Sequence, residues 1–229
     1  MFFYDATYIL VLIGAVLSMW ASMRVNSTYK KYAQVRSMSG LTGAEAARRI
    51  LNGAGIYDVR IEHISGNLTD HYDPRGKVLR LSDTVYGSAS VAAVGVAAHE
   101  CGHAIQHDQG YVPLKIRGAF VPVANIGTKA AIPIILLGLV LGSSGTLIEI
   151  GLLCFACGTF FQLITLPVEF NASARAVDIL GNTHMLSDTE LRSTKKVLSA
   201  AAMTYVAAAA ASILSLLRLA LLFGGRRRD

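Results

Sequence analysis

Residues 91–108 read VAAVGVAAHECGHAIQHD, an apolar run that leads directly into the motif H-E-x-x-H between His99 and His103. Ser88 or Ser90 can cap a helix that starts there, and a turn containing glycine follows the run, so the segment is predicted to be one helix. A helix that is apolar all round is typically buried. Positions i and i+4 lie on the same face of a helix, so both imidazoles are expected to point the same way.

This spacing allows His99 and His103 to bind one metal ion, with Glu100 beside it. The carboxylate of Glu100 could then accept a proton from a water molecule that attacks a carbonyl, which is the general-base role associated with this motif. Zn²⁺ is the metal favoured by availability and geometry, although nickel, cobalt or iron could also occupy such ligands. The alternative is that the histidines only cap or pack the helix, because a motif with three fixed positions also arises by chance.

The composition indicates a membrane protein. Of the 229 residues 53% are apolar and 16% are charged, and the mean hydropathy is +0.47. Residues 7–23 carry no charge. Residues 130–168 contain Glu149 as their only charged residue, and Gly142–Gly145 is expected to form a turn in their middle. Residues 197–223 are apolar and rich in alanine. These segments predict about four transmembrane helices. The expected parts are an N-terminal anchor (1–23), a cytoplasmic segment (24–117), a transmembrane helical hairpin (118–168), a cytoplasmic helix (169–196), and a transmembrane or re-entrant helix with a basic tail (197–229).

Basic residues follow the anchor and precede the hairpin, so the positive-inside rule places residues 24–117 in the cytoplasm. The expected location is the plasma membrane, with several crossings. The N-terminus lacks a basic signal-peptide region, so the anchor is expected to remain. If the last helix crosses completely, residues 226–228 (three arginines) end outside, so that helix is re-entrant or the orientation is reversed. The net charge of +6 fits lipid headgroups better than nucleic acid, because no basic stripe alternates with aromatic residues.

The polar part of the chain predicts a small α+β domain. Thr42 and Glu45 form a capping-box pattern that starts a helix. Residues 59–64 and 77–82 alternate apolar and polar side chains, as half-buried strands do. The predicted fold class is therefore a mainly α membrane protein with a small α+β domain, whose active-site helix carries the H-E-x-x-H motif.

A catalytic zinc usually has three protein ligands and one water, so a third ligand is needed. His107 continues the series, but it lies about 6 Å further along a straight helix than His103. Glu169 follows the expected hairpin and is the other candidate, although it could equally be a surface carboxylate. Three cysteines exclude a framework of several disulfides, and the Cys154-x-x-Cys157 pair is expected to serve helix packing.

The chain resembles the bacterial membrane-bound neutral zinc metallopeptidases, which are related in arrangement to the heat-shock membrane proteases and prenyl-protein endopeptidases of the gluzincin clan. The resemblance rests on four segments: Thr42-Gly43 with its helix, Leu68–Arg75 (LTDHYDPR), His99–His107, and Leu166–Phe170 (LPVEF). It implies a zincin-like domain in which His99, His103 and Glu169 bind zinc and Glu100 is the base.

In relatives an aspartate four residues after the third ligand commonly orients a zinc-binding histidine, but here that position is Ser173. A hydroxyl could still accept the histidine N–H, and Asp178 is a substitute only if the helix bends. A cationic or hydrogen-bonding group should also stabilise the oxyanion that develops during hydrolysis, and Arg175 and His184 are the candidates. Arg175 could instead face lipid headgroups, and His184 could be an ordinary loop residue.

The expected function is a membrane-bound zinc endopeptidase that acts on peptides, membrane proteins or segments near the bilayer. Two alternatives stay open. One is a protease whose site lies inside the bilayer, although the uncharged stretch 87–98 is too short to span. The other is a non-catalytic membrane scaffold or adaptor with a structural zinc, for which a fourth protein ligand such as His107 would be evidence. Nothing in the sequence predicts the oligomeric state.

Overall fold

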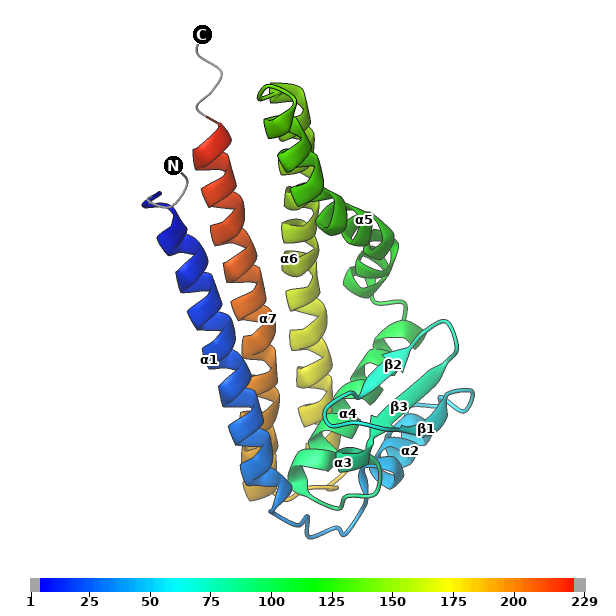
Figure 1. The fold of residues 1–229 in the computed structure, drawn as a ribbon. Helices are drawn as coiled ribbons and strands as arrows, with labels where there is room; N and C mark the ends of the chain where they lie inside the picture. The colour runs from blue at the N-terminus through cyan, green and yellow to red at the C-terminus, as the bar shows by residue number, and fades with distance from the viewer. Residues whose placement is uncertain (1–4, 225–229) are drawn as a thin grey trace. The chain divides into compact units, whose positions relative to one another are not determined.

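The computed structural model describes residues 5–224, so the arginines at 226–228 lie outside the described residues. Most of the described chain is helical, and its short strands form one sheet (Figure 1). In chain order the elements are α1 (Tyr8–Ala33), α2 (Gly43–Gly53), β1 (Arg60–Ile64), β2 (His71–Asp73), β3 (Val78–Ser82), α3 (Asp83–Tyr86), α4 (Val91–Asp108), α5 (Val112–Val140), α6 (Gly145–Asn182) and α7 (Asp188–Phe223).

The chain divides into two compact units. The helical unit takes its described residues from ranges 1–22, 116–166 and 203–229, and the mixed unit comprises 23–115 and 167–202. Helices α1, α6 and α7 therefore each contribute one part to each unit. The whole sheet and the motif helix α4 belong to the mixed unit.

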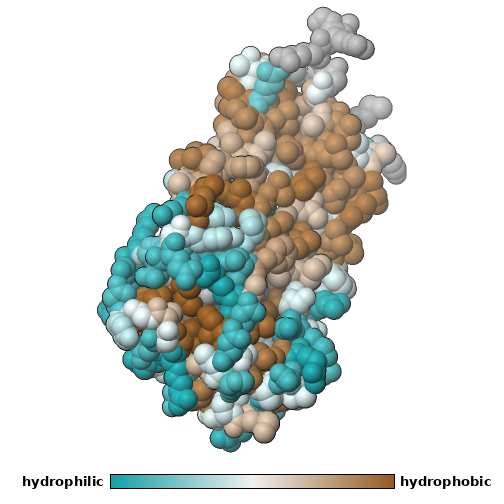
Figure 2. All heavy atoms as spheres, turned by 180° about the vertical axis from the view of Figure 1, so that it is seen from behind, coloured by the Kyte–Doolittle hydropathy of each residue, from teal (hydrophilic) through white to brown (hydrophobic). Residues whose placement is uncertain are grey.

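Four helices in the described residues are long and apolar enough to cross a membrane: α1, α5, α6 and α7. The prediction of four such helices is confirmed. Brown, apolar side chains cover the part of the surface formed by these helices in Figure 2.

Within the helical unit, small residues let the helices approach closely. A Cβ on Gly14 would lie 3.0 Å from Cα of Ala211, and a Cβ on Gly127 would lie 2.8 Å from the carbonyl oxygen of Cys154.

The mixed unit is built around a three-stranded sheet with the order β1-β3-β2. Strand β1 pairs with β3 in parallel, and β2 pairs with β3 in the antiparallel sense, so β2 is an edge strand. The predicted strands at 59–64 and 77–82 correspond to β1 and β3. The predicted capping box is also present, because the Thr42 side chain accepts from the Glu45 N–H and the Glu45 side chain accepts from the Thr42 N–H.

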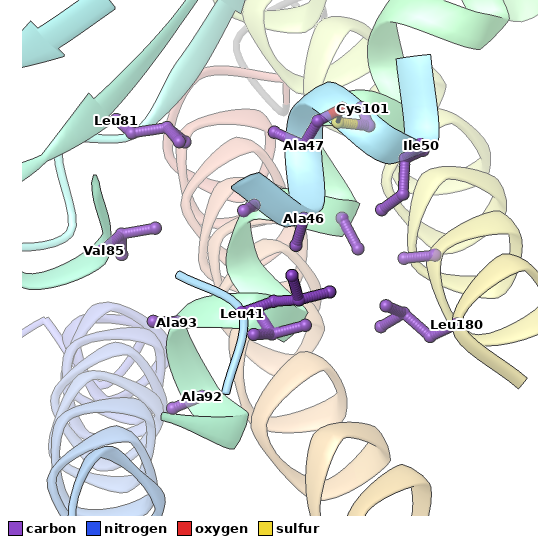
Figure 3. Packing of buried hydrophobic residues seen from close by; sticks show 14 of the residues in the cluster. Leu41, Ala46, Ala47, Ile50, Leu81, Val85, Ala92, Ala93, Cys101 and Leu180 are labelled. Carbon is purple, nitrogen blue, oxygen red and sulfur yellow. Dashed lines mark hydrogen bonds between the residues drawn. The ribbon is translucent and has the colours of Figure 1, made fainter. Parts of the chain in front are cut away.

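Buried side chains from α2, α3, β3, α4 and α6 meet in one core within the mixed unit (Figure 3). Helix α6 contributes Ala176 and Leu180 to this core, and Ala172, one turn earlier on the same face, is also fully buried. Cys101 packs into this core from α4, and its thiol lies 3.6 Å from the carbonyl oxygen of Ala47 as a weak hydrogen bond. The core therefore fixes α4 against α6, and these are the two helices that carry the candidate site.

The helix boundaries differ from the sequence-based expectation in two places. Glu169 does not begin a new helix, because α6 runs without a break from Gly145 to Asn182 and contains Pro167. A proline is tolerated inside apolar helices when neighbouring groups satisfy the freed backbone carbonyl. Helix α7 begins at Asp188 rather than near Val197, and its first turn is acidic, as the helix dipole favours.

Candidate metal centre

Helix α4 places the H-E-x-x-H motif in the interior of the mixed unit. Its N-terminus is capped by Ser90, whose side chain accepts a hydrogen bond of 3.2 Å from the Ala93 N–H. The absence of a side chain at Gly102 allows a close approach to α6: a Cβ there would lie 2.6 Å from the carbonyl oxygen of Ala172. Because α4 and α6 touch at Gly102, the motif histidines come close to the residues just before Ala172 in α6.

Three side chains from the two helices converge at this contact. Nε2 of His99 lies 3.3 Å from Oε2 of Glu169, and Nε2 of His103 lies 3.5 Å from the same oxygen. One ligand atom from each of the three residues lies within 4.8 Å of the others. In a tetrahedral zinc site with bonds of about 2.0–2.1 Å, neighbouring ligand atoms are about 3.3 Å apart. The donor set and the two distances to Glu169 therefore fit a zinc ion with three protein ligands.

Each histidine is held from its other ring nitrogen. Nδ1 of His99 lies 3.1 Å from Oγ of Ser173, and Nδ1 of His103 lies 3.1 Å from Oε1 of Gln106. Ligating histidines commonly use this second nitrogen to fix the orientation of the ring. Ser173 thus provides the hydroxyl contact to a motif histidine that is expected from the sequence at this position. Both Nε2 atoms are left facing Glu169.

The surroundings of Gln106 determine which nitrogen of His103 carries a proton. The Gln106 side chain is fully buried, and its Nε2 donates to the carbonyl oxygen of Val168 and to Oδ1 of Asn171, both at 2.9 Å. Two acceptors account for both amide hydrogens, so the atom facing His103 must be the acceptor Oε1. Nδ1 of His103 is therefore the donor, and in the neutral ring the lone pair lies on Nε2, where a metal can bind.

This hydrogen-bond chain continues to a cation. Oδ1 of Asn171 also accepts from Nε of Arg175 at 2.7 Å, and a second guanidinium nitrogen donates to Oε1 of Gln109 at 2.7 Å. The guanidinium carbon lies 5.9 Å from the ring centroid of Tyr111. Arg175 is thus engaged by Gln109 just after α4, by Asn171 of α6 and by the ring of Tyr111. This favours a positioning role for Arg175 over direct contact with an oxyanion.

Burial and neighbouring charges shift the pKa values of two side chains on α4, His103 and Cys101. Burial by itself would lower the pKa of His103, but the hydrogen bond that the ring donates to Glu169 and the charges of Glu100 and Glu169 outweigh it and raise the pKa. Glu100 and Glu169 are buried, with 8% and 2% of their surface exposed. Burial raises the pKa of the Cys101 thiol well above its usual value, and the charge of Glu100 adds to the shift. Cys101 packs in the core and is not part of the group of three possible ligands.

The other candidate residues lie elsewhere. His107 is not part of the group of three, and its Nδ1 forms a 2.9 Å hydrogen bond with the Tyr72 hydroxyl. A helix rises about 1.5 Å per residue, so Asp178 lies about 14 Å beyond Glu169 along α6. His184 follows the end of α6 and lies about 20 Å or more beyond Glu169. His184 is exposed in the connection to α7, with a φ of 53°. Neither residue is brought to the three-residue group.

The comparisons with known proteins show the family to which the chain belongs. A profile of the family described as "Putative neutral zinc metallopeptidase" matches residues 7–224. The chain belongs to this family. It is also similar to a Bacillus subtilis (strain 168) protein named "Putative membrane protease YugP", with 48% identity over 217 residues that cover 94% of this chain and 96% of the relative. No solved structure gives a significant match. With four candidate membrane-spanning helices in the described residues, the chain is a membrane protein.

Sequence reasoning missed two residues of the site. Gln106 and Asn171 connect His103 to Arg175, yet neither is a metal ligand nor part of a known short motif. One signal was available: Gln106 is an uncharged polar residue one turn after His103, on a helix predicted to be buried. A buried amide needs partners, so its presence there indicates a polar group close by.

Proposed function

We propose that this chain is a membrane-bound zinc endopeptidase. Zn²⁺ is held by His99, His103 and Glu169, and Glu100 is the general base. The observation that carries the proposal is the convergence of three possible ligand atoms from His99, His103 and Glu169. The buried carboxylate of Glu100 lies on the same helix as the two histidines. The family match supports the same reading.

Three protein ligands leave one position in a tetrahedral site, which is typical of catalytic rather than structural zinc. When bound, zinc supplies Lewis acidity, lowering the pKa of a water molecule and polarising a peptide carbonyl. Glu100 accepts a proton from the attacking water and passes it to the leaving amine. Gln106 and Ser173 hold the two imidazoles so that their Nε2 atoms stay directed at the metal position.

The edge strand β2 is the proposed docking element for substrate. Tyr72 lies in the middle of β2, and its hydroxyl bonds with His107 one turn after His103 on α4. Because β2 pairs only with β3 in the described sheet, its other edge can pair with an extended peptide backbone. Tyr72→Pro removes a backbone N–H from this strand and should slow cleavage. Unchanged rates in a folded Tyr72→Pro variant would argue against docking on β2.

The proposed substrates are membrane proteins or peptide segments close to the bilayer. Helix α4 is not among the helices of the described chain that could span a membrane, which supports hydrolysis at the membrane face over cleavage inside the bilayer. The proposed location is the plasma membrane, with the mixed unit in the cytoplasm. Tyr57, which is 79% exposed, gives a test of this orientation. A cysteine placed there should react with an impermeant maleimide only after the cells are lysed, and reaction in intact cells would reverse the proposed topology.

The activity itself is tested with the full-length protein purified in detergent and an unfolded membrane protein as substrate. Cleavage should stop with a zinc chelator and return when zinc is added in excess of the chelator. Stoichiometric zinc with no cleavage across a broad panel of substrates would contradict the enzyme and favour a zinc-stabilised scaffold.

A further inference from the structure

A second polar hollow lies in the mixed unit, on helices that contribute no residue to the metal centre. It is about 640 Å³ in volume and lies between the later turns of α1 and the early turns of α7, which run side by side in Figure 1. From α1 it is lined by Arg24, Ser27, Thr28, Lys31 and Tyr32, and from α7 by Lys195, Lys196, Ser199 and Ala200.

The spacing of the α1 residues shows that they form one face. Arg24, Thr28 and Lys31 are separated by four and three residues, so their side chains line one side of the helix. On α7, Lys196 and Ala200 are likewise one turn apart. Four cations and four hydroxyl groups therefore line the hollow from two sides. No aspartate or glutamate is among the described residues that line it.

The position of the hollow along both helices is equally informative. The apolar stretch of α1 ends at Met23, and Arg24 is the first charged residue after it. On α7 the order is reversed, because Lys195 and Lys196 directly precede the alanine-rich apolar stretch that starts at Val197. Both helices are candidate membrane spans. The hollow thus lies where both helices change from apolar to charged, at the level expected for lipid headgroups.

We propose that this hollow binds the phosphate-bearing headgroup of an anionic phospholipid. Lysine and arginine side chains complement the phosphodiester charge, and the hydroxyls of Thr28 and Ser199 can donate hydrogen bonds to its oxygens. Basic pockets between membrane-spanning helices are suited to such headgroups. A lipid is favoured over a soluble phosphate compound because acyl chains can lie along the apolar stretches that adjoin the hollow on both helices.

The test measures lipid binding to the full-length protein in detergent by native mass spectrometry. The probes are dioleoyl phosphatidylglycerol, dioleoyl phosphatidylcholine and glycerol 3-phosphate. We expect phosphatidylglycerol to bind in preference to phosphatidylcholine. We also expect millimolar glycerol 3-phosphate to leave the bound lipid in place. Equal binding of the two lipids would overturn the proposal, and displacement by glycerol 3-phosphate would indicate a soluble phosphate ligand instead.

Matched variants separate this hollow from the general basic character of the surface. The double variant Lys31→Gln with Lys196→Gln removes two lining charges and should weaken phosphatidylglycerol binding about 30-fold, or about fivefold per charge. The control Lys30→Gln with Arg192→Gln removes the same net charge from the same two helices, but outside the hollow. The control should change binding less than about threefold. Equal losses in both double variants would show that only net charge matters and would refute the site.

A second double variant, Arg24→Gln with Lys195→Gln, removes the other two lining cations and tests whether the loss of binding depends on which two are removed. All four cations of the hollow are exposed, so neither pair is expected to disturb the fold. Both lining pairs should behave alike if one headgroup contacts both helices. A loss confined to one pair, with the other equal to the control, would contradict a shared site.

Discussion

Replacing Gln106 by leucine removes the buried amide that holds His103. The change keeps the side-chain volume roughly constant, so the core is not emptied. In the native protein the amide accepts from Nδ1 of His103 and donates to the Val168 carbonyl and to Asn171. In the variant, Asn171 keeps its hydrogen bond from Arg175. Val168 lies inside α6, so its carbonyl retains the usual partner four residues on.

The expected loss of stability in Gln106→Leu follows from the buried polar group that loses its hydrogen-bond partner. Only the Nδ1–H of His103 is buried without an acceptor in Gln106→Leu, which costs about 1–3 kcal/mol of unfolding free energy in the metal-free protein. Loss of an orienting contact to a metal ligand typically weakens metal binding about 10–100-fold. We therefore expect zinc affinity to fall by that factor. In Gln106→Glu a carboxylate can still accept from His103 but cannot donate to Val168 or Asn171. We expect that variant to lose stability while keeping zinc affinity within a few-fold of the native value.

The assay is competition for zinc between the purified protein and a chromophoric chelator, together with thermal unfolding of the metal-free protein. Gln34→Leu is the matched control, because it makes the same substitution at an exposed residue outside this hydrogen-bond chain. It should alter stability by less than about 0.5 kcal/mol and leave zinc affinity unchanged. If folded Gln106→Leu bound zinc as tightly as the control, the inference that this amide orients His103 would be refuted.

Two further predictions concern the same helix. Gly102→Ala should destabilise the protein by about 1–3 kcal/mol and weaken zinc binding, because the new Cβ meets backbone atoms of Ala172 and pushes α4 from α6. Gly53→Ala, where nothing lies within 4 Å, should shift stability by no more than about 1 kcal/mol, and equal effects of the two changes on zinc affinity would contradict the contact argument. The raised pKa of His103 means that the metal-free fold binds this proton more tightly than the unfolded chain. The contribution of His103 to metal-free stability is therefore fully present below the unfolded value near 6.5 and is lost as pH rises through the folded value, whereas zinc binding strengthens over the same range. Melting temperatures with chelator from about pH 5 to pH 9 should reveal this decline, and a site-specific increase with pH would contradict it.

Local sequence signals were sufficient to predict several helices and one turn. Ser88 or Ser90 followed by a continuous apolar run predicted α4, and the structure shows that Ser90 is the cap, which accepts from the Ala93 N–H. Hydropathy predicted the four long apolar helices of the described chain, because their composition distinguishes them without any tertiary information. The Gly142–Gly145 turn is likewise local, and it separates α5 from α6.

The rest depends on contacts between residues distant in sequence. Gln106 and Asn171 are 65 residues apart, and no local pattern indicates that their side chains bond. Strand β2 has only three residues, too few to show an alternating pattern. The expected start of a separate helix at Glu169 is not found, because α6 runs without a break through Pro167 from Gly145 to Asn182. The positions of His99, His103 and Glu169 relative to one another therefore required the structure, although the resemblance to a family had indicated these residues.

The central claim is that Glu100 activates water at a zinc ion held by the three neighbouring ligands. The most direct test is to purify the native protein and Glu100→Gln in detergent, measure bound zinc in each, and follow cleavage of the same unfolded membrane protein. We expect equal zinc content in both proteins and cleavage by the native protein alone. Cleavage by Glu100→Gln at the native rate, with equal zinc content, would show that Glu100 is not the general base.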